Sequence, residues 1–408
     1  MDLIFNNRNF AFLWLSQLVS QVGNRMFQIA LLWWIIGQDP NNSGKYAAAL
    51  LVLGVIPPII FLNIIGKLID RHSPLRILAP GGIAGTVFSV VLALLTLTKI
   101  DLLPVLFASV FIFGTIQAFI EPTLMKMVPY VAPKEQTTEA VAYLSSTQTL
   151  AFFTGAVIGA ILVEQVGILG IVLLNGAAFF ISLLSYRAIK IDEDPSPAGT
   201  EVSAKGESTL SVLKGLPLIR NLLLGFGAMN MFGTPILVVL PLYTKNILQQ
   251  TASMLGIFEG CIWLGIFSGS IIASRLVVER TLLFVAGNVL VFGIMIALPG
   301  AFINPWFYGF CLYGMGTSLG LLNVKIVSYF QDEIENEKKG RFFSLLRAVT
   351  MAAMPIGFTV FGFLADQIHL TTLCLVQGIG VIAMSTLFAF LAKNEQAKKG
   401  VSSIGGVA

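Results

Sequence analysis

The sequence predicts an all-α polytopic membrane protein with twelve transmembrane helices. Of its 408 residues, 56% are hydrophobic and only 11% are charged, and the mean hydropathy is +0.85. Soluble domains carry about a quarter charged residues, so this chain has too little polar surface for a large protein in water. Long apolar runs such as residues 168–184 favour helices over the alternating strands of a membrane barrel.

Twelve segments reach the roughly 20 residues that a helix needs to cross about 30 Å of hydrocarbon. The first six are 10–37, 44–69, 75–98, 102–130, 137–163 and 167–188; the second six are 217–247, 252–276, 281–301, 305–330, 341–367 and 369–391. The first has no Ala-x-Ala-like site ahead of it, so we expect a retained helix rather than a cleaved leader.

Lysine and arginine are divided unequally between the two sides of these spans, which predicts the orientation. Cytoplasmic loops retain positive charge. With the amino terminus inside, the outer side receives only Lys45, Lys99 and Lys245, and nearly all the other loop charges fall on the inner side. We therefore expect both termini on the cytoplasmic side. The short loops and the absence of a leader are compatible with a bacterial inner membrane. Topology then explains the net charge of +4, and nothing indicates nucleic-acid binding.

A polar connection at residues 190–216 divides the spans six and six, and its composition is typical of a flexible linker. Similar residues recur across this division. At an offset of 202, Gly155 pairs with Gly357 and Glu164 pairs with Asp366. The sequence thus predicts two pseudo-symmetric six-helix bundles, residues 1–189 and 217–392, followed by a cytoplasmic tail at 393–408.

A charged break between the second and third spans reads Gly-x-Leu-x-Asp-Arg at residues 66–71. It resembles the signature of the major facilitator superfamily, although the following His72-Ser73-Pro74-Leu75-Arg76 offers a single further basic residue. Residues 340–345, Gly-Arg-Phe-Phe-Ser-Leu, look like the macrolide-efflux-type branch of drug and siderophore exporters. The resemblance covers the whole chain in topology and implies a drug:proton antiporter.

The resemblance also implies a gate on the cytoplasmic side. In the superfamily the aspartate of this motif contacts the start of the eleventh helix, where a helix dipole or an arginine can stabilise the carboxylate. Such a contact would hold the two halves together. The alternative is that the basic residues only set topology. The expected gate comprises Gly66, Asp70, Arg71, Arg76, Gly340 and Arg341.

Polar residues on the first span predict the lining of a substrate cavity. A charge inside a membrane is costly unless it faces a cavity or a partner. Gln21, Asn24, Arg25 and Gln28 are three or four residues apart and share one helix face. Lys325 and Arg347 are further cavity candidates, but their long side chains can snorkel to the interface, and we favour that structural role for both. The alternatives for Arg347 are a pair with an acidic group across the halves and attraction of an anionic substrate.

Two carboxylates inside spans are candidates for proton coupling. Glu121 precedes Pro122 in the fourth span, and Glu259 lies about two turns into the eighth. We place Glu121 first. The alternatives are an ion pair of Glu121 with Arg25 or Lys126, and a hydrated vestibule position for Glu259. Asp366 is expected to be hydrated at the outer end of its helix, without a coupling role.

Small and cyclic residues predict how the helices pack and bend. Gly155 and Gly159 form Gly-x-x-x-Gly in the fifth span and predict close helix packing. Prolines inside spans prevent regular hydrogen bonding and predict bends in helices that rock. They are Pro57, Pro58, Pro235, Pro241 and Pro355.

These features predict a secondary transporter, not an enzyme. No phosphate-binding loop and no nucleophile–His–acid arrangement is present, and the three cysteines lack metal-ligand spacing, so we expect neither a cofactor nor a metal. The expected activity is proton-coupled efflux of an amphipathic drug, macrolide or siderophore-like molecule by alternating access, giving multidrug resistance. Alternatives are an importer of a nutrient or siderophore, a non-transporting receptor and a membrane enzyme acting on lipid. The sequence is compatible with a monomer.

Overall fold

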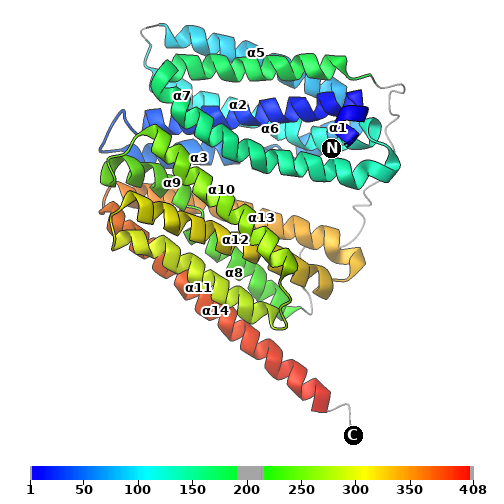
Figure 1. Cartoon of the computed structure of the whole chain (residues 1–408), viewed down its shortest axis with the longest axis vertical. Helices are drawn as coiled ribbons and strands as arrows, with labels where there is room; N and C mark the ends of the chain where they lie inside the picture. The colour runs from blue at the N-terminus through cyan, green and yellow to red at the C-terminus, as the bar shows by residue number, and fades with distance from the viewer. Residues whose placement is uncertain (1, 99, 191–212, 214–215, 405–408) are drawn as a thin grey trace. The chain divides into compact units, whose positions relative to one another are not determined.

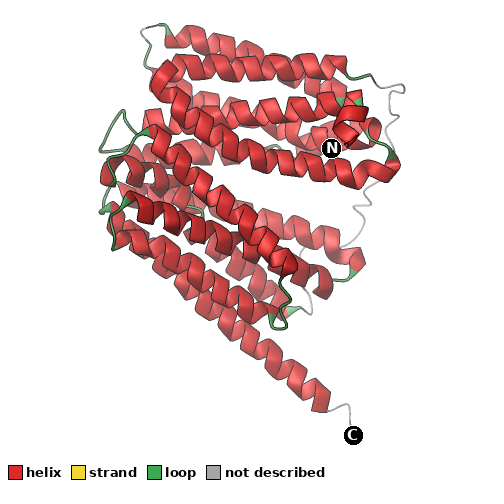
Figure 2. Cartoon of the chain, in the orientation of Figure 1, coloured by secondary structure: helices red, strands yellow, loops and turns green. Residues whose placement is uncertain are grey.

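The computed structural model describes residues 2–98, 100–190, 213 and 216–404. Helices account for nearly all of these residues, and the described part of the chain contains no strand (Figure 2). The all-α fold class is therefore confirmed.

Short connections join the main helices within each half of the chain (Figure 1). In the first half they are α1 (Asp2–Asn6), α2 (Arg8–Ile35), α3 (Ser43–Ile60), α4 (Leu62–Arg71), α5 (Leu75–Thr96), α6 (Leu102–Val131) and α7 (Thr137–Ala188). In the second half they are α8 (Pro217–Gly233), α9 (Ile236–Leu242), α10 (Ala252–Arg275), α11 (Thr281–Ala297), α12 (Pro305–Glu333), α13 (Asn336–Ala365) and α14 (Leu370–Ile404). Single-turn helices lie at Lys134–Gln136, Tyr243–Ile247 and Leu298–Gly300.

Polar side chains fix where several helices begin. The Asn7 side chain accepts a hydrogen bond from Phe10 N at 3.0 Å and starts α2. Asp101 accepts from Leu103 N at 3.1 Å before α6, and Asn304 accepts from Phe307 N at 3.0 Å before α12. Each oxygen satisfies a first-turn N–H that has no partner within its helix.

Ten helices of the described chain are long and apolar enough to cross a membrane. Two features separate this number from the predicted twelve. The helix α2 is not among the ten, and it carries the polar residues of the predicted cavity face. The long helix α7 is counted once, although Gly167, with φ 62° and ψ −173°, interrupts it between the predicted fifth and sixth spans. The number twelve therefore stays a prediction.

The prolines differ in their effect on the helices. The second predicted span is interrupted at Phe61, three residues after Pro58, where α3 ends and α4 begins. The seventh is interrupted at Pro235, between α8 and α9. By contrast, α13 runs through Pro355 without a break.

The described residues group into two compact units. Unit 1 comprises the described residues of Met1–Pro40, Ala49–Glu201 and Thr251–Gly260, and unit 2 those of Asn41–Ala48, Val202–Gln250 and Cys261–Ala408. The units differ from the predicted halves by two short segments, 41–48 and 251–260. Most of the predicted linker lies outside the described residues. Helix α14 continues into the predicted tail as far as Ile404, and 405–408 lie outside the description.

Small residues set the packing inside each unit. In unit 1, a Cβ on Gly159 would lie 2.6 Å from Met26 O, so α7 passes directly against the backbone of α2. In unit 2, a Cβ on Gly293 of α11 would lie 2.9 Å from the backbone nitrogen of Ile382 in α14. The close helix packing predicted at Gly155 and Gly159 is therefore observed, with both glycines buried against α2.

Candidate functional site

A buried ion pair lies in unit 1, between the first predicted span and the start of α10. The Arg25 guanidinium donates through Nη2 to Glu259 Oε2, although the two residues are 234 positions apart. Arg25 is 9% exposed and Glu259 is 4% exposed. The structure therefore brings together a predicted cavity residue and a predicted proton-coupling residue. It does not place Glu259 in a hydrated vestibule.

The pair is surrounded by groups that can change partners. Arg25 Nη1 lies 3.4 Å from Gln28 Oε1, and the guanidinium carbon lies 5.5 Å from the centre of the Phe152 ring. Arg25 Nε and Gln21 Oε1 are buried without a hydrogen-bond partner among the described residues. A buried polar atom without a partner is costly. Arg25 thus has two possible hydrogen-bond acceptors on its own helix, Gln21 one turn before it and Gln28 one turn after it.

Glycines allow the backbones near this pair to approach one another. A Cβ on Gly155 would lie 2.9 Å from Arg25 Cβ, and a Cβ on Gly256 would lie 3.0 Å from Val157 Cα. Both α2 and the first turns of α10 therefore pack closely against α7. Side chains larger than hydrogen at these positions would push the two charged helices away from α7.

Glu121 occupies a different environment. It lies on α6, is exposed, and accepts a hydrogen bond from Gln148 Nε2 of α7 at 2.5 Å. Neither of the basic partners that we considered for it is its partner in the structure. Arg25 pairs with Glu259, and Lys126 binds backbone carbonyls.

Two lysines donate hydrogen bonds to carbonyl oxygens at the ends of helices. Lys126 Nζ donates to the carbonyl oxygens of Ile69 and, at 3.2 Å, His72, where α4 ends. Lys325 Nζ donates to Leu276 O at 2.5 Å, directly after α10. The last carbonyls of a helix carry partial negative charge and lack partners within the helix. Lys325 therefore caps the end of α10, and its place in a substrate cavity stays a prediction.

Two carboxylates cap helix starts. Asp366, at the end of α13, accepts from Gly44 N at 2.7 Å and from Lys45 N at 3.0 Å, at the start of α3. Its side chain is only 3% exposed, so the expectation that Asp366 is hydrated is wrong. Glu164 of α7 accepts from Ala252 N at 2.7 Å and from Ser253 Oγ at 3.1 Å, at the start of α10.

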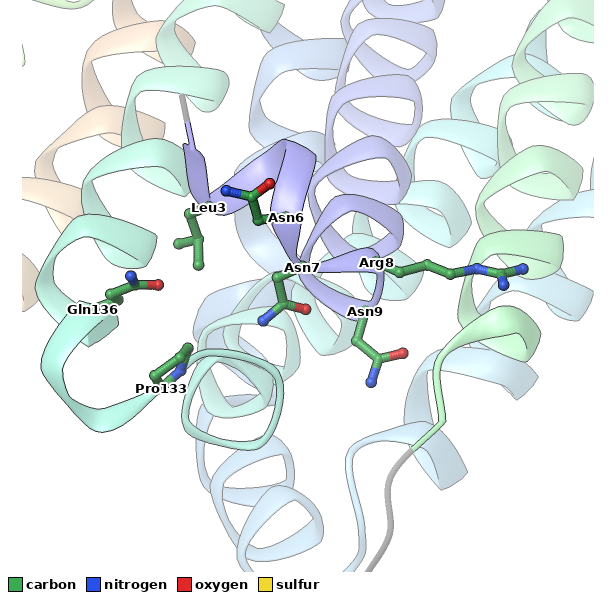
Figure 3. Close-up of a pocket in the computed structure, with 7 residues that line it drawn as sticks. All are labelled: Leu3, Asn6, Asn7, Arg8, Asn9, Pro133 and Gln136. Carbon is green, nitrogen blue, oxygen red and sulfur yellow. The ribbon is translucent and has the colours of Figure 1, made fainter.

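A surface pocket of about 400 Å³ lies near the start of the chain, and none of the residues that line it is a predicted site residue. Figure 3 shows its polar groups, with Arg8 pointing away from Leu3 and Gln136. Asn7 Nδ2 donates to Val131 O at 2.6 Å and Asn9 Nδ2 donates to Lys190 O at 2.8 Å. These side chains join segments, and the pocket is a packing junction. Among the described residues, no three His, Cys, Asp or Glu side chains could hold a metal ion.

Comparison with known proteins decides the family. The model of the Major Facilitator Superfamily matches residues 13–348 of the chain. The chain belongs to this superfamily. Proteins of this superfamily transport solutes across membranes, so this member is an integral membrane transporter rather than an enzyme.

Named relatives of this superfamily member include exporters. It is 25% identical over 398 residues to macrolide efflux protein A of Streptococcus pyogenes. The aligned region covers 93% of this chain and 96% of that protein. It is 27% identical over 321 residues to macrolide efflux protein A of Enterococcus faecalis, covering 75% and 97%. The predicted resemblance to the macrolide-efflux-type branch is thereby confirmed.

Solved structures of the superfamily share the fold. The nucleoside transporter NupG has a TM-score of 0.71 at 11% identity, covering 96% of this chain and 99% of that one. A bacterial homologue of the iron transporter ferroportin, in an inward-facing state, has a TM-score of 0.70 at 16% identity, covering 94% and 98%. At these identities the likeness establishes the fold alone.

The superfamily motif lies at the end of α4. Ile65 and Ile69 are buried against Ile77 and Ala118, which anchors α4 within unit 1. This packing leaves the other face exposed, with Gly66, Asp70 and Arg71, and Arg76 follows at the start of α5. Gly340 and Arg341 lie on α13, in unit 2. The expected gate contact joins residues of different units and stays a prediction.

The remaining cavity candidates lie on α2 and α13. Asn24, Gln21 and Gln28 are half-buried on α2, and Arg347 is exposed on α13. The structure brings Gln28 to Arg25.

Sequence reasoning missed several partners in this superfamily member. Phe152, Gln148 and Ser253 are uncharged, so the search for charges inside spans passed over them. A signal was present for two of them. Gln148 and Phe152 are four residues apart and therefore share one face of α7, together with Gly155.

Proposed function

We propose that the protein exports amphipathic small molecules from the bacterial cytoplasm in exchange for protons, and that this antiport confers multidrug resistance. The names of its relatives support export, and their bacterial sources support an inner membrane. The excess of lysine and arginine on one side supports both termini in the cytoplasm. The substrate is a drug, macrolide or siderophore-like molecule.

The observation that carries the coupling proposal is the buried Arg25–Glu259 pair. A carboxylate inside a membrane is retained where it does chemistry or meets a partner, and Glu259 has one partner that its own protonation would release. A proton arriving at the Glu259 carboxylate neutralises it and breaks the ion pair. The freed Arg25 then turns toward acceptors on its own helix, Gln28 or Gln21.

When Arg25 moves away from Glu259, the carboxylate becomes available to bind the substrate. A cationic amphipathic molecule can take the position of the Arg25 guanidinium on the ionised Glu259, while an apolar part lies against the Phe152 ring. Proton and substrate then compete for one carboxylate, so each leaves when the other binds. On the same ground of burial we place Glu259 ahead of Glu121, which is exposed and bound to an amide.

The test is flux in proteoliposomes under an imposed pH gradient. Amphipathic drugs and iron chelators are offered as a panel, and both substrate and lumenal pH are followed. In Glu259→Gln we expect the linked proton movement to vanish, with substrate moving only down its own gradient. Glu121→Gln tests the second candidate for proton coupling in the same assay. Glu279 is an exposed carboxylate in a loop, and Glu279→Gln is the control. Unchanged proton-driven flux in Glu259→Gln would remove Glu259 from the coupling.

The same assay separates the alternatives. Substrate accumulation on the side opposite to that expected for export identifies an importer of a nutrient or siderophore. Movement of substrate without protons indicates another ion or uniport. Saturable binding without flux of either species supports the receptor.

A further inference from the structure

Polar side chains from three helices of unit 1 meet beside the buried ion pair. Gln117 of α6 donates through Nε2 to Ser20 Oγ of α2 at 3.1 Å. One turn further along α6, Glu121 accepts the hydrogen bond from Gln148 of α7 at 2.5 Å. Helix α6 therefore presents an amide to α2 and a carboxylate to α7. Together with two amides of α2, these residues form what we call the polar cluster: Gln17, Ser20, Gln21, Gln117, Glu121 and Gln148.

Three buried polar atoms on one face of α2 have no hydrogen-bond partner among the described residues. They are Gln17 Oε1, Gln21 Oε1 and Arg25 Nε. Gln17 is 1% exposed, and its amide nitrogen donates to Leu144 O of α7 at 3.1 Å, which fixes the direction of its oxygen. Buried polar atoms in folded proteins are paired with protein groups or with ordered water. The three unpaired atoms therefore indicate positions that bind water.

The spacing of these atoms suits a continuous row of water. Gln17, Gln21 and Arg25 follow one another at intervals of four residues, and each interval corresponds to a rise of about 6 Å along α2. One water molecule that makes two hydrogen bonds of about 2.8 Å spans about the same distance. Water at these positions would thus connect the ion pair with the rest of the polar cluster.

The polar cluster also reaches the ion pair along α7. The Arg25 guanidinium carbon lies 5.5 Å from the centre of the Phe152 ring, and Gln148 lies one turn before Phe152. The partner of Gln148 is Glu121. Glu121 is exposed, whereas Glu259 is 4% exposed. A buried carboxylate and an exposed carboxylate therefore lie at the two ends of one group of polar side chains, all within unit 1.

The two carboxylates lie at different depths in the predicted topology. Glu259 is about two turns into α10, which begins on the predicted outer side. Glu121 is about three turns before α6 ends on the predicted cytoplasmic side. If entering protons drive export, a proton bound at Glu259 must continue to the cytoplasm. Glu121 lies on the cytoplasmic side of Glu259, and its exposure gives it access to bulk water.

We propose that Glu121 is a proton relay, which accepts the proton that leaves Glu259 and releases it toward the cytoplasm. While Glu259 is protonated, Arg25 is drawn toward Gln28, so the guanidinium does not stand between the carboxyl group and the water at Gln21. The first water takes the proton from Glu259 and passes one of its own protons to the next. The Glu121 carboxylate accepts the last of these, and Arg25 returns to the ionised Glu259. The amides of the polar cluster orient the water and keep their own protons.

This inference rests on the proposed proton coupling at Glu259. It changes the role of Glu121 from a competing coupling residue to the next station on the same path. Coupling and relay then predict different defects. Loss of the coupling carboxylate changes how many protons move for each substrate, whereas loss of the relay slows both movements together.

The experiment therefore measures rate and ratio separately. The full chain is reconstituted in proteoliposomes under an imposed pH gradient, and the movements of erythromycin and of protons are followed. Glu121→Gln still accepts the bond from Gln148 but cannot carry the proton. We expect both initial rates to fall at least about tenfold, with an unchanged ratio of protons to erythromycin and unchanged erythromycin binding. Glu121→Asp, which keeps a titratable carboxylate, should recover part of the rate.

Two further variants and a map complete the test. Glu139→Gln is the matched control, since Glu139 is an exposed carboxylate on the predicted cytoplasmic side of the same unit, and we expect wild-type rates. Gln17→Leu removes a water-binding oxygen without changing a charge, and should lower both rates by a smaller factor at the same ratio. Thermal unfolding verifies that each variant is folded. A high-resolution electron cryomicroscopy map of the wild-type chain should show water at Gln17 Oε1 and Gln21 Oε1.

The outcomes distinguish failure of the relay from failure of the coupling. Wild-type rates in Glu121→Gln, while Glu259→Gln is uncoupled, would overturn the relay and leave the coupling proposal standing. A changed proton ratio in Glu121→Gln would overturn it as well, because Glu121 would then be a coupling residue itself. So would a map without water at both glutamine oxygens. If the wild-type chain moves no protons with erythromycin or any other member of the panel, the coupling proposal fails and the relay fails with it.

Discussion

Arg25 and Glu259 form an ion pair in which each charge lowers the free-energy cost of burying the other inside a membrane. Both are nine-tenths buried or more, and isolated charges in such surroundings are expensive. The pair therefore sets a condition on folding as well as on transport. A helix bundle that separated α2 from the start of α10 would leave two buried charges unmatched.

The first prediction concerns this pair. Arg25→Met or Glu259→Met alone should each lower the free energy of unfolding by about 3–5 kcal/mol, because the remaining charge loses its partner. The double variant should recover much of this loss, since two apolar side chains then meet. Denaturant unfolding of the purified protein in detergent measures the cycle. Additive single effects would mean that the two residues are not energetically coupled.

The residues of this site were partly predictable from sequence. Arg25 and Glu259 were both recognised, because a charge inside an apolar run is conspicuous. Their pairing was not, since 234 residues separate them and only the packing of α2 and α10 on α7 brings them together. Asp366 was misjudged for a similar reason. Its place at a helix end is visible in sequence, but the α3 start that covers it is not.

At the scale of elements, glycine positions decide how near the helices lie. Gly159→Ala should lower the free energy of unfolding by about 1–3 kcal/mol, because the new methyl group meets the Met26 backbone of α2. Gly287→Ala in α11 is the control. Its Cβ would meet nothing within 4 Å among the described residues, so we expect no loss and a gain of up to about 1 kcal/mol from helix propensity. Thermal unfolding of both variants in the same detergent compares them.

The lysine caps supply a second prediction at this scale. Lys126→Met and Lys325→Met should each cost about 1–2 kcal/mol, because a charged donor to helix-end carbonyls is lost while the apolar stem is kept. Lys67→Met, an exposed change on α4, should cost nothing measurable. Denaturant titration compares the three variants. Equal stability of all three would show that water replaces the lysine ammonium without loss.

The hydrophobic pattern predicts the positions of the helices closely. It predicts less well where a helix is interrupted. Prolines at 57–58 and 235 accompany breaks, whereas Pro355 does not. A proline only removes one hydrogen bond and crowds the preceding turn. Whether the helix then ends or continues depends on packing that the sequence does not display.

At the scale of the whole molecule, each unit contains a short segment from the other half of the sequence. This predicts how the protein behaves when the chain is cut into two fragments. Fragments 1–203 and 204–408 should copurify when expressed together, because the cut falls between the predicted bundles. Expressed alone, each should be poorly folded, since residues 251–260 group with unit 1 and residues 41–48 group with unit 2. Size-exclusion chromatography and thermal unfolding of single and paired fragments test this. Two stable, monodisperse single fragments would contradict it.

The family assignment and the two-fold repetition were accessible from sequence, because the motif at 66–71 and the 202-residue offset are local patterns that can be read directly. The grouping of residues into units was not accessible in the same way. It depends on contacts of the first turns of α3 and α10, whereas an apolar pattern places a helix in the membrane without naming its neighbours.

The position of Glu259 in unit 1 has a consequence for biosynthesis. The ribosome makes Arg25 first, and more than half of the chain must follow before its counter-ion exists. Until then the newly inserted first helix carries an unmatched guanidinium. Domains generally fold in order of synthesis, yet here the earlier unit cannot be finished on its own. We therefore expect the first helix to settle into its final place only after the start of α10 has been made and inserted.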